Sequence, residues 1–552
     1  MSNEPQAPQE PAKGISRRTF LGRLIAGIGL LAAAGGGYLS LRKPARTAAD
    51  IGGSIQGAAA KVGHQLRSLA PFQPTETIRT RVAIVGAGAS GLSAAYALRK
   101  AGLDDFLVLD LEEKYGGNAS SGRNAVSAYP WGAHYVPIPD PANKELIALF
   151  EALGIITGWV LDKPVYREDY LCQAPHERLL LHGSWQEGLV PKLGVPKEEL
   201  AQIHAFEAEM DRLKHSVGSD GQPAFAIPVA RSSQDPQFLA FDQQTMADYL
   251  RGKGWTSQHL HWYVDYCCRD DFGTTVEATS AWAGIHYFAA RAGTAANATD
   301  SDVLTWPEGN GWLMDRLAEQ VGPRIRCGQL VRAVRNTADG VELDVVVVAD
   351  GRHVRIQAKQ AIFAGPRFVA SRVVEGLSPD SAFTYAPWVV ANVTLSQRPS
   401  GHGAPLSWDN VAYGSRSLGY ILADHQSLLA HNPDATVLTW YEPLTQDAPA
   451  AARAQALKAD HAYWKNYVLA DLEAMHPGIT ETVQTVDVWV WGHGMIRPVP
   501  GYVTGQARQA AAQPLGKVHF AHTDMSGLSI FEEAYYWGNR AAEAVLANSP
   551  KA

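Results

Sequence analysis

Residues 82–110 read VAIVGAGASGLSAAYALRKAGLDDFLVLD. A short β-branched run that ends at Val85 predicts a buried parallel strand, and three glycines follow it. Gly86 permits a tight turn, and Gly88 removes a side chain so that a pyrophosphate can approach the backbone. Gly91 lets the following helix pack closely on the strand. This spacing predicts the strand, turn and helix of a dinucleotide-binding unit.

The helix after these glycines is expected over residues 89–100. Its first residues, Ala89 and Ser90, would offer free N–H groups to the phosphates at the positive end of the helix dipole. Residues 106–109 supply a second strand, and Asp110 stands where an acid accepts hydrogen bonds from an adenosine ribose. An acid here disfavours a 2′-phosphate, so the pattern predicts FAD or NAD rather than NADP. The expected fold class is therefore α/β, with a Rossmann-like GxGxxG domain.

From this point the chain resembles the flavin amine oxidase superfamily, which also holds protoporphyrinogen oxidases and phytoene-type desaturases. The family's long FAD fingerprint continues to a Gly-Gly pair, and Gly116-Gly117 stands at that spacing from the acid. Family members next carry an arginine, whereas this chain has Asn118. Arg123 is then the expected substitute near the flavin phosphates. The resemblance implies a non-covalent FAD, since no cysteine lies near the C-terminal flavin segments.

Later blocks extend this resemblance over most of the chain. The segment WGAHY at 131–135 resembles the one that passes over the flavin ring. Residues 306–311 and 324–334 resemble the return to the FAD domain, where one residue holds the adenine through its backbone. Residues 518–524 resemble the closing strand, and a helix from about 532 to 545 would point at the flavin pyrimidine edge. The resemblance implies cofactor contacts at Gly132, Ala133, Val331, Asp524 and Phe531.

The matched blocks alternate with long stretches that match the family poorly, which predicts two interleaved domains. The cofactor domain is expected over residues 76–145, 300–380 and 480–552. An inserted substrate domain of mixed β-sheet and helices is expected over residues 146–299 and 381–479. A signal segment over residues 1–41 and a linker over residues 42–75, rich in Ala, Gly, Ser and Pro, precede them.

The N-terminal segment has the charged-then-apolar order of a bacterial export signal. Within it, SRRTFL at 16–21 resembles the consensus of the twin-arginine route, whose substrates cross the membrane folded. A protein that captures its flavin inside the cell needs such a route. We therefore expect the twin-arginine machinery as a partner and a periplasmic location, with retention through an uncleaved signal as an alternative.

Composition excludes several other classes. A formal charge of −7 leaves no basic excess for nucleic acid. Four scattered cysteines are too few for a disulfide scaffold, and no two have the spacing of metal ligands, so no metal site is predicted.

The reaction is less strongly indicated than the cofactor. Family members that oxidise amines commonly offer a lysine near the flavin and two aromatic rings around the amine, and the strand at 387–394 places Ala391 or Asn392 at the lysine position. His134 and His493 lie close in sequence to the flavin segments and could accept protons near neutral pH. Trp491 precedes the last FAD block, where family members place substrate-facing aromatics. We take His134, Trp491 and His493 as candidate catalytic residues.

The expected function is two-electron oxidation of a small organic substrate, most simply an amine or amino acid, with oxygen or a quinone as acceptor. A desaturase or oxidase that acts on C–C or ring bonds of an apolar substrate is the first alternative. A flavin-carrying envelope protein without turnover is the second.

Overall fold

The computed structural model describes residues 47–68, 70–427 and 434–548. The chain divides into two compact units, Met1–Asp50 and Ile51–Ala552. In the first unit the described residues form one 3-10 turn, Ala48–Asp50, and the expected signal over residues 1–41 lies outside the described residues. Among the helices that the structure describes, none is long and apolar enough to cross a membrane.

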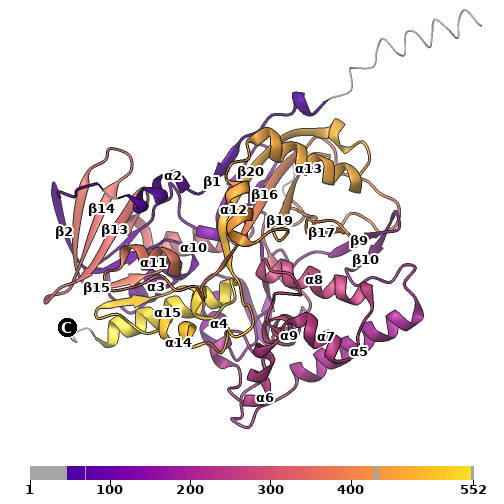
Figure 1. Cartoon of the computed structure of the whole chain (residues 1–552), viewed down its shortest axis with the longest axis horizontal. Coiled ribbons are helices and arrows are strands. Elements are labelled where there is room, and N and C mark those ends of the chain that lie inside the picture. The colour runs from indigo at the N-terminus through magenta and orange to yellow at the C-terminus, as the bar shows by residue number, and fades with distance from the viewer. Residues whose placement is uncertain (1–46, 69, 428–433, 549–552) are drawn as a thin grey trace, which may run out of the picture. The chain divides into compact units, whose positions relative to one another are not determined.

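A seven-stranded sheet forms the centre of the cofactor half of the second unit, and Figure 1 shows its strands beside α3 and α15. Its strand order is β12-β3-β2-β15-β14-β13, and β21 pairs with β15. Strands β12, β3, β2, β15 and β21 pair in parallel, whereas β14 and β13 form an antiparallel extension. The strands are β2 (Glu76–Val85), β3 (Phe106–Leu109), β12 (Ile325–Arg326), β13 (Gln329–Asn336), β14 (Val341–Val347), β15 (His353–Phe363) and β21 (Val518–Phe520).

Both faces of this sheet are covered, because alternate residues of its strands point into different hydrophobic cores. Val82 and Ile84 pack with helices α3 (Ala89–Lys100), α10 (Gly311–Val321) and α15 (Phe531–Ala547). Ala83, between them, belongs to the core on the other face with α11 (Arg367–Val373). A parallel sheet buried on both faces reads as a continuous apolar run, and this explains why residues 82–85 were recognisable as a strand.

Helices α3 and α15 lie in close contact. A Cβ placed on Gly538 of α15 would stand 2.4 Å from the carbonyl oxygen of Ser90 and 2.8 Å from Cβ of Ser93. The C-terminal helix is thus held directly against the helix that follows the glycine turn. This packing brings α3, near the start of the second unit, into contact with α15, near its end.

An eight-stranded sheet forms the centre of the other half, in the order β1-β20-β16-β19-β18-β17-β9-β10. Its long strands β16, β19 and β20 stand together in Figure 1 beside α12 and α13. The strands are β1 (Ile55–Gly57), β9 (Glu177–Leu181), β10 (Ser184–Glu187), β16 (Tyr385–Leu395), β17 (Asp409–Ala412), β18 (Tyr420–Leu422), β19 (Thr436–Pro443) and β20 (Val483–Ile496). Every residue of β16 is buried, as expected for a central strand.

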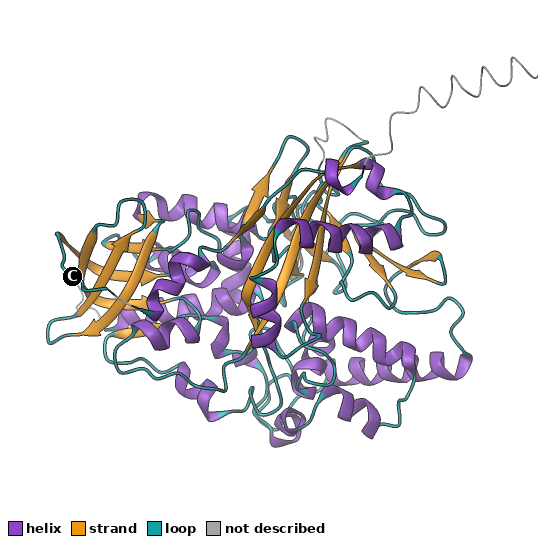
Figure 2. Ribbon diagram, turned by 45° about the horizontal axis from the view of Figure 1, so that its top comes forward, coloured by secondary structure: helices purple, strands orange, loops and turns teal. Residues whose placement is uncertain are grey.

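Helices lie against this second sheet, and Figure 2 distinguishes them in purple from the orange strands. Helices α5 (Lys197–Lys214), α7 (Met246–Gly252), α8 (Gln258–Phe272) and α9 (Ala281–Ala289) share one hydrophobic core. The other helices are α2 (Ala60–Gly63), α4 (Lys144–Ala152), α6 (Pro236–Leu239), α12 (Pro449–Ala456), α13 (His461–Met475) and α14 (Gln506–Ala511). Short two-stranded ribbons are formed by β4 (Ser121–Arg123) with β5 (Ala128–Pro130), β6 (Tyr135–Pro137) with β11 (Val303–Thr305), and β7 (Ile156–Val160) with β8 (Lys163–Tyr166).

Three expected domain boundaries need correction. The expected linker over residues 42–75 contains β1, which pairs in parallel with β20. Because the side chains of β1 are all exposed, their sequence carries no burial pattern. The expected third cofactor segment begins too early at residue 480, since β20 is a strand of the eight-stranded sheet and the chain returns to the cofactor sheet only at β21. The boundary at residues 145–146 cuts through α4, whose buried residues pack in the cofactor core.

Candidate active site

Two cavities adjoin one another between the halves of the second unit. The cofactor cavity, of about 230 Å³, contains the glycine turn after β2, the Gly116-Gly117 pair and the start of α15. The substrate cavity, of about 140 Å³, lies against β16, β19, α8, α9 and the same helix start. Seven residues line both cavities and mark their boundary: Asn118, Ala133, Asn310, Gly494, Ser529, Ile530 and Phe531.

The glycine turn forms one wall of the cofactor cavity. Gly86 has φ +104°, a conformation that side chains rarely adopt. Gly88 precedes α3 and lies directly beside Gly116, with which it forms a short β-bridge. A Cβ on Gly91 would lie only 1.8 Å from the carbonyl oxygen of Gly86. The wall is therefore bare backbone at the N-terminus of a helix, which suits a pyrophosphate.

Asp110 lines the same cavity and is held by backbone amides. Its Oδ2 accepts a hydrogen bond from Ala87 N at 2.5 Å, and its Oδ1 accepts one from Glu112 N at 2.8 Å. Burial raises the pKa of Asp110, and these two bonds oppose the rise. The carboxylate is thereby fixed at the end of β3, facing the cavity.

Asn118 joins the two cavities. Its Nδ2 donates to the carbonyl oxygen of Gly494 on β20, while its own carbonyl accepts from Ala133 N at 3.0 Å. The family arginine that Asn118 replaces would be a cation, so this chain puts a neutral amide at the boundary. A Cβ on Gly132 would lie 2.4 Å from the same carbonyl, which requires glycine there.

Helix α8 delivers two carboxyl groups to the substrate cavity. Ser257 starts the helix by accepting a hydrogen bond from Leu260 N, and Gly273, with φ +58°, ends it. A Cβ on Gly273 would meet Ala386 and Trp388 of β16 at 2.5 and 2.6 Å, so the helix end presses on the sheet. Asp270 and Asp271 stand in this last turn and line the cavity. A helix C-terminus disfavours anions, so their placement costs stability.

Asp271 is neutralised within the cavity and Asp270 is not. Arg291 donates to Asp271 Oδ1 at 3.2 Å and to the Tyr135 hydroxyl at 3.1 Å, and its guanidinium stacks 4.3 Å from the Tyr287 ring. Over the ranges that the structure describes, the Asp270 side chain has neither a hydrogen bond nor an ion pair. Burial and the neighbouring Asp271 raise the pKa of Asp270 to about 7.

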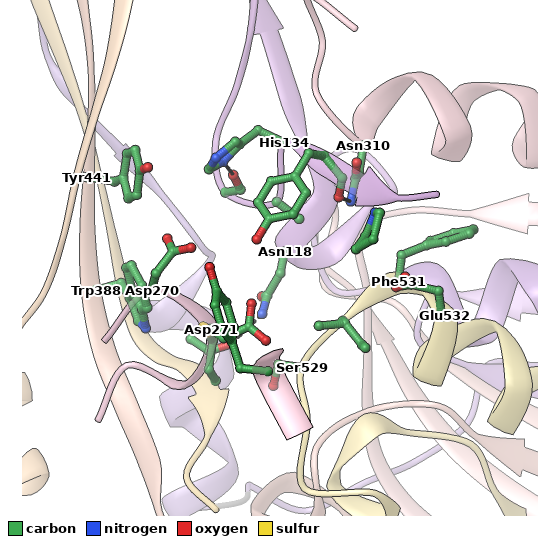
Figure 3. A pocket seen from close by; sticks show the side chains of 18 of the residues that line it. Asn118, His134, Asp270, Asp271, Asn310, Trp388, Tyr441, Ser529, Phe531 and Glu532 are labelled. Carbon is green, nitrogen blue, oxygen red and sulfur yellow. Dashed lines mark hydrogen bonds between the residues drawn. The ribbon is translucent and has the colours of Figure 1, made fainter. Parts of the chain in front are cut away.

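Glu532 is a third carboxyl group in this cavity. It is the second residue of α15, only 3% exposed, and the bond to its own backbone amide is the one hydrogen bond of its side chain among described residues. Burial raises its pKa to about 7. Figure 3 shows Phe531 and Glu532 on one side of the cavity and Asp270 with Trp388 on the opposite side.

The structure brings the candidate catalytic residues to the cavities in different ways. His134 lines the substrate cavity, and its Nδ1 donates to Gly132 O at 3.0 Å, which leaves Nε2 free to accept. Trp491 lines the same cavity and donates from Nε1 to Trp131 O at 2.6 Å. His493 lines the cofactor cavity and stacks on Phe368 with ring centroids 4.0 Å apart, close to the flavin segments as its sequence position indicated.

Neither histidine titrates near neutral pH, contrary to expectation. Burial lowers the pKa of His134 to about 4. Burial, together with Arg453 and other cations nearby, lowers the pKa of His493 to about 3. Both rings are neutral at pH 7, so they serve as hydrogen-bonding and packing groups in the free protein.

A comparison with protein-family models identifies the family of this chain. Residues 89–546 match the family described as flavin containing amine oxidoreductase. The chain belongs to that family. It is accordingly a FAD-dependent oxidoreductase.

A curated relative of this chain has a low sequence identity to it. Oxidoreductase PigB of Serratia sp. (strain ATCC 39006) is 24% identical over 298 residues, which are 49% of this chain and 41% of that protein. The chain therefore spans less than half the length of this curated relative.

Solved structures share the fold at low identity. Wild-type putrescine oxidase bound to putrescine superposes with a TM-score of 0.61 at 18% identity, over 86% of this chain and 100% of that one. Cyclohexylamine oxidase from Brevibacterium oxydans IH-35A superposes with a TM-score of 0.58 at 17% identity, over 85% of this chain and 99% of that one. A putative protoporphyrinogen oxidase from Exiguobacterium sp. 255-15 superposes with a TM-score of 0.56 at 16% identity, also over 85% of this chain and 99% of that one.

The cofactor cavity fits FAD, because the glycine turn and the N-terminus of α3 line it with backbone and small side chains. Most residues expected at the cofactor line one or both cavities: Gly86, Gly88, Ala89, Ser90, Asp110, Gly116, Gly117, Asn118, Gly132, Ala133 and Phe531. Gly91 stands behind this wall, where it permits the helix and strand to touch.

Three other expected cofactor residues lie elsewhere. Arg123 is corrected, since its side chain is 71% exposed and pairs with Glu308 at 2.9 Å. Asp524 is buried behind the cavity, where its Oδ2 accepts from Arg367 N at 2.7 Å and from the Tyr385 hydroxyl at 2.6 Å. Its neighbours, His522 and Thr523, line the cavity in its place. Val331 packs in the core of the cofactor sheet and lines neither cavity.

Sequence reasoning missed the acids of the substrate cavity. Asp270, Asp271 and Arg291 lie in the stretch that matches the family poorly, and no local motif distinguishes them from solvated charges. The packing of α8 on β16 brings Asp270 and Asp271 inside.

Proposed function

We propose that this protein oxidises a small amine in the substrate cavity, with FAD in the cofactor cavity. The observation that carries the proposal is the charge of the cavity wall. Among described residues, three carboxyl groups line it and Arg291 is its one permanent cation. Because Arg291 is engaged by Asp271 and Tyr135, the remaining carboxyl groups favour a cationic ligand.

The same charges favour an amine over an amino acid. The carboxylate of an amino acid needs a donor or cation that is free to receive it. Arg291 already donates to two partners, and the two histidines of the wall are neutral, since burial also lowers the pKa of His286 to about 4. An amino acid would therefore bring a second anion into an acidic cavity.

We propose that the helix start at Gly88, Ala89 and Ser90 holds the FAD pyrophosphate, with Gly116-Gly117 beside it, and that Asp110 receives the ribose. FAD bound here would accept two electrons from the substrate. The protein orients the substrate: the aromatic wall of Trp388, Tyr441 and Trp491 excludes water, and His134 Nε2 offers an acceptor for an amine hydrogen.

A desaturase or oxidase acting on an apolar substrate is the second candidate. It is favoured by one observation: among described residues, no lysine lines the cofactor cavity or the substrate cavity. Membership of a family of oxidoreductases gives no support to a flavin-carrying protein without turnover.

We further propose export by the twin-arginine route to the periplasm, with oxygen or a quinone as electron acceptor. The support is the sequence at residues 16–21 and the need to acquire FAD before export. A fusion of residues 1–60 to a reporter that is active only when exported folded tests this, and replacement of Arg17-Arg18 by Lys-Lys should abolish export.

The activity is tested with purified holoprotein under anaerobic conditions. Bleaching of the flavin absorbance by amines, but not by amino acids or apolar alkenes, is the expected result. Bleaching only by an apolar substrate would favour the desaturase, and a visible spectrum without flavin would overturn both.

A further inference from the structure

We infer that Arg67, Arg372 and Arg453 form an anion site at the rim of the cofactor cavity, where their charge balances the phosphates of FAD. Arg67 is brought there by residues 51–67, a segment that we call the strap. The inference rests on the proposed place of FAD in this cavity. It adds a part of the chain that precedes the family match over residues 89–546.

The cofactor cavity has no permanent cation in its wall. Among the described residues that line it there is neither lysine nor arginine, and Asp110 is an acid. The pyrophosphate of FAD brings further negative charge, against which the N-terminus of α3 sets about half a positive charge. Asn118 stands in place of the family arginine, and Arg123 pairs with Glu308. The cations that balance the phosphates must therefore stand behind the wall.

Two arginines stand beside His493, which lines the cofactor cavity. Arg453 of α12 donates from Nη1 to the carbonyl oxygen of Gly492 at 3.3 Å, and its Cδ would lie 3.3 Å from a Cβ on that glycine. Phe368 of α11 stacks on the His493 ring. Arg372 follows Phe368 by one helical turn and so shares its face of α11.

Arg67 completes this group from the strap. Burial lowers the pKa of His493, and the next causes are all cationic side chains: Arg453, His64, Arg67 and Arg372. His64 carries no charge at pH 7, because burial and two neighbouring arginines lower its pKa. Over the ranges that the structure describes, none of the three arginines forms an ion pair. These three, the cation cluster, thus hold positive charge without a protein counter-ion in the described part of the chain.

A short series of contacts connects His493 with the glycine turn. Its neighbour Gly494 accepts a hydrogen bond from Asn118, which directly follows Gly117. A Cβ on Gly117 would lie 3.3 Å from Cα of Gly88. Because Gly88 and His493 line the same cavity, the field of the cation cluster acts on phosphates bound at the glycine turn.

Two other basic side chains near this cavity are engaged by acids. His522 Nδ1 lies 3.0 Å from Asp524 Oδ1. Burial lowers the pKa of Arg367, whereas Asp380 and Asp524 oppose this and so balance its charge. The charge of the cation cluster is not balanced in this way, which distinguishes it as the site for an external anion.

The strap is fastened to both halves of the second unit. Its strand β1 pairs with β20, and Asp487 Oδ1 accepts a hydrogen bond from Ser54 N at 3.1 Å. On the cofactor half, both oxygens of Glu112 accept from Ala59 N, at 3.0 and 2.9 Å. Leu66 packs against the core of the cofactor sheet. The strap therefore holds the two halves together around the cofactor.

The course of the strap follows the cofactor cavity. Leu111, which comes directly after the proposed ribose acid Asp110, would have its Cδ2 3.4 Å from a Cβ on Gly63. The 3-10 turn that follows ends at Arg67, in the cation cluster. Figure 1 shows the strap in indigo, from β1 beside β20 to α2. It thus runs from the ribose end of the cavity to the cation cluster, and its attachment should slow the release of FAD.

The test measures how fast FAD leaves the holoprotein, by the gain of flavin fluorescence after dilution. Arg67→Gln, Arg372→Gln and Arg453→Gln should each raise the release rate about threefold, and the triple variant about tenfold or more. Arg67→Lys keeps the charge and should stay within about twofold of the wild type. Arg79→Gln is the matched control, because Arg79 is exposed near the start of β2, whose other end meets the cavity.

Salt identifies the effect as electrostatic. An increase from about 50 to about 500 mM NaCl should speed FAD release from the wild type more than from the triple variant, since exposed charges are screened. A merely structural role predicts equal salt dependence in both proteins and a release from Arg67→Lys as fast as from Arg67→Gln. That result, or unchanged release from the triple variant, would overturn the anion site.

Trypsin tests the strap itself, because it cleaves after Lys61 and Arg67. Both bonds should be cut several-fold more slowly in the holoprotein than after removal of FAD, since the strap and FAD stabilise one another. Equal cleavage would overturn the role of the strap. A protein that contains no flavin and takes up none would overturn the proposed function itself. No amine enters these measurements, so failure of amine oxidation alone leaves the inference standing.

Discussion

Replacement of Gly91 by alanine tests the packing that creates the cofactor cavity. The new Cβ would stand 1.8 Å from Gly86 O and 2.9 Å from Gly86 C, and both atoms are backbone, which cannot rotate away. Real Cβ contacts below 3.0 Å are essentially never found, so α3 must retreat from β2 by about 1.2 Å. The opposite side of α3 resists this movement, because Gly538 of α15 already approaches Ser90 closely.

The expected change in the free energy of unfolding is the sum of two opposing effects. Overpacking of this kind costs about 1–3 kcal/mol, and the blocked retreat puts Gly91→Ala at the upper end. Alanine gains about 1 kcal/mol over glycine in a helix. The free energy of unfolding should therefore fall by about 2 kcal/mol, and FAD should bind more weakly because the glycine turn is displaced.

The assay is urea unfolding of the apoprotein together with the ratio of flavin to protein absorbance in the purified holoprotein. Gly252→Ala is the matched control: Gly252 ends α7, and a Cβ there would meet no described atom within 4 Å. The control should keep its FAD and gain up to about 1 kcal/mol. A Gly91→Ala protein with full FAD content and unchanged unfolding would refute the packing argument.

Three further predictions concern the substrate cavity. The pKa of Asp270 in the folded protein, about 7, exceeds that in the unfolded chain, so this carboxyl group lowers the stability as pH rises from about 4 to 7. Asp270→Asn should remove this cost and raise the free energy of unfolding by roughly 2–4 kcal/mol at pH 8 but little at pH 4. Urea unfolding at both pH values measures the difference. Amine binding should weaken as pH falls below about 7, because Asp270 and Glu532 become protonated, and a KM that is flat between pH 6 and 8 would contradict this. Trp491→Phe removes the hydrogen bond to Trp131 O, so the amine KM should rise about fivefold, a loss of about 1 kcal/mol, with FAD content unchanged as the internal control.

Prediction succeeded where the determining interactions are local. The helix expected over residues 89–100 and the strand expected over residues 106–109 are found with those limits, as α3 and β3. Turn glycines and a continuous apolar run specify this unit within 30 residues. In contrast, β1 was read as part of a linker, because an edge strand with exposed side chains is held by backbone hydrogen bonds that any sequence can make.

The two expected acids at the cofactor show the same limit. Asp110 lies at the cavity because it follows β3 directly. Asp524 is only a few residues from its expected place, yet its carboxylate turns to Arg367 N and Tyr385, which come from distant parts of the chain. Sequence position fixed the neighbourhood of both groups, but the direction of a side chain depends on long-range partners.

The sequence by itself determined the cofactor half: the order of strand, glycine turn, helix and acid has few physical solutions, and each step concerns neighbours along the chain. Only the tertiary structure decided what surrounds the substrate. Asp270 and Glu532 are 262 positions apart, and they share a cavity because α8 presses on β16 while α15 packs on α3. Burial, not residue type, makes their charge significant, and burial depends on contacts between segments that are far apart in the sequence.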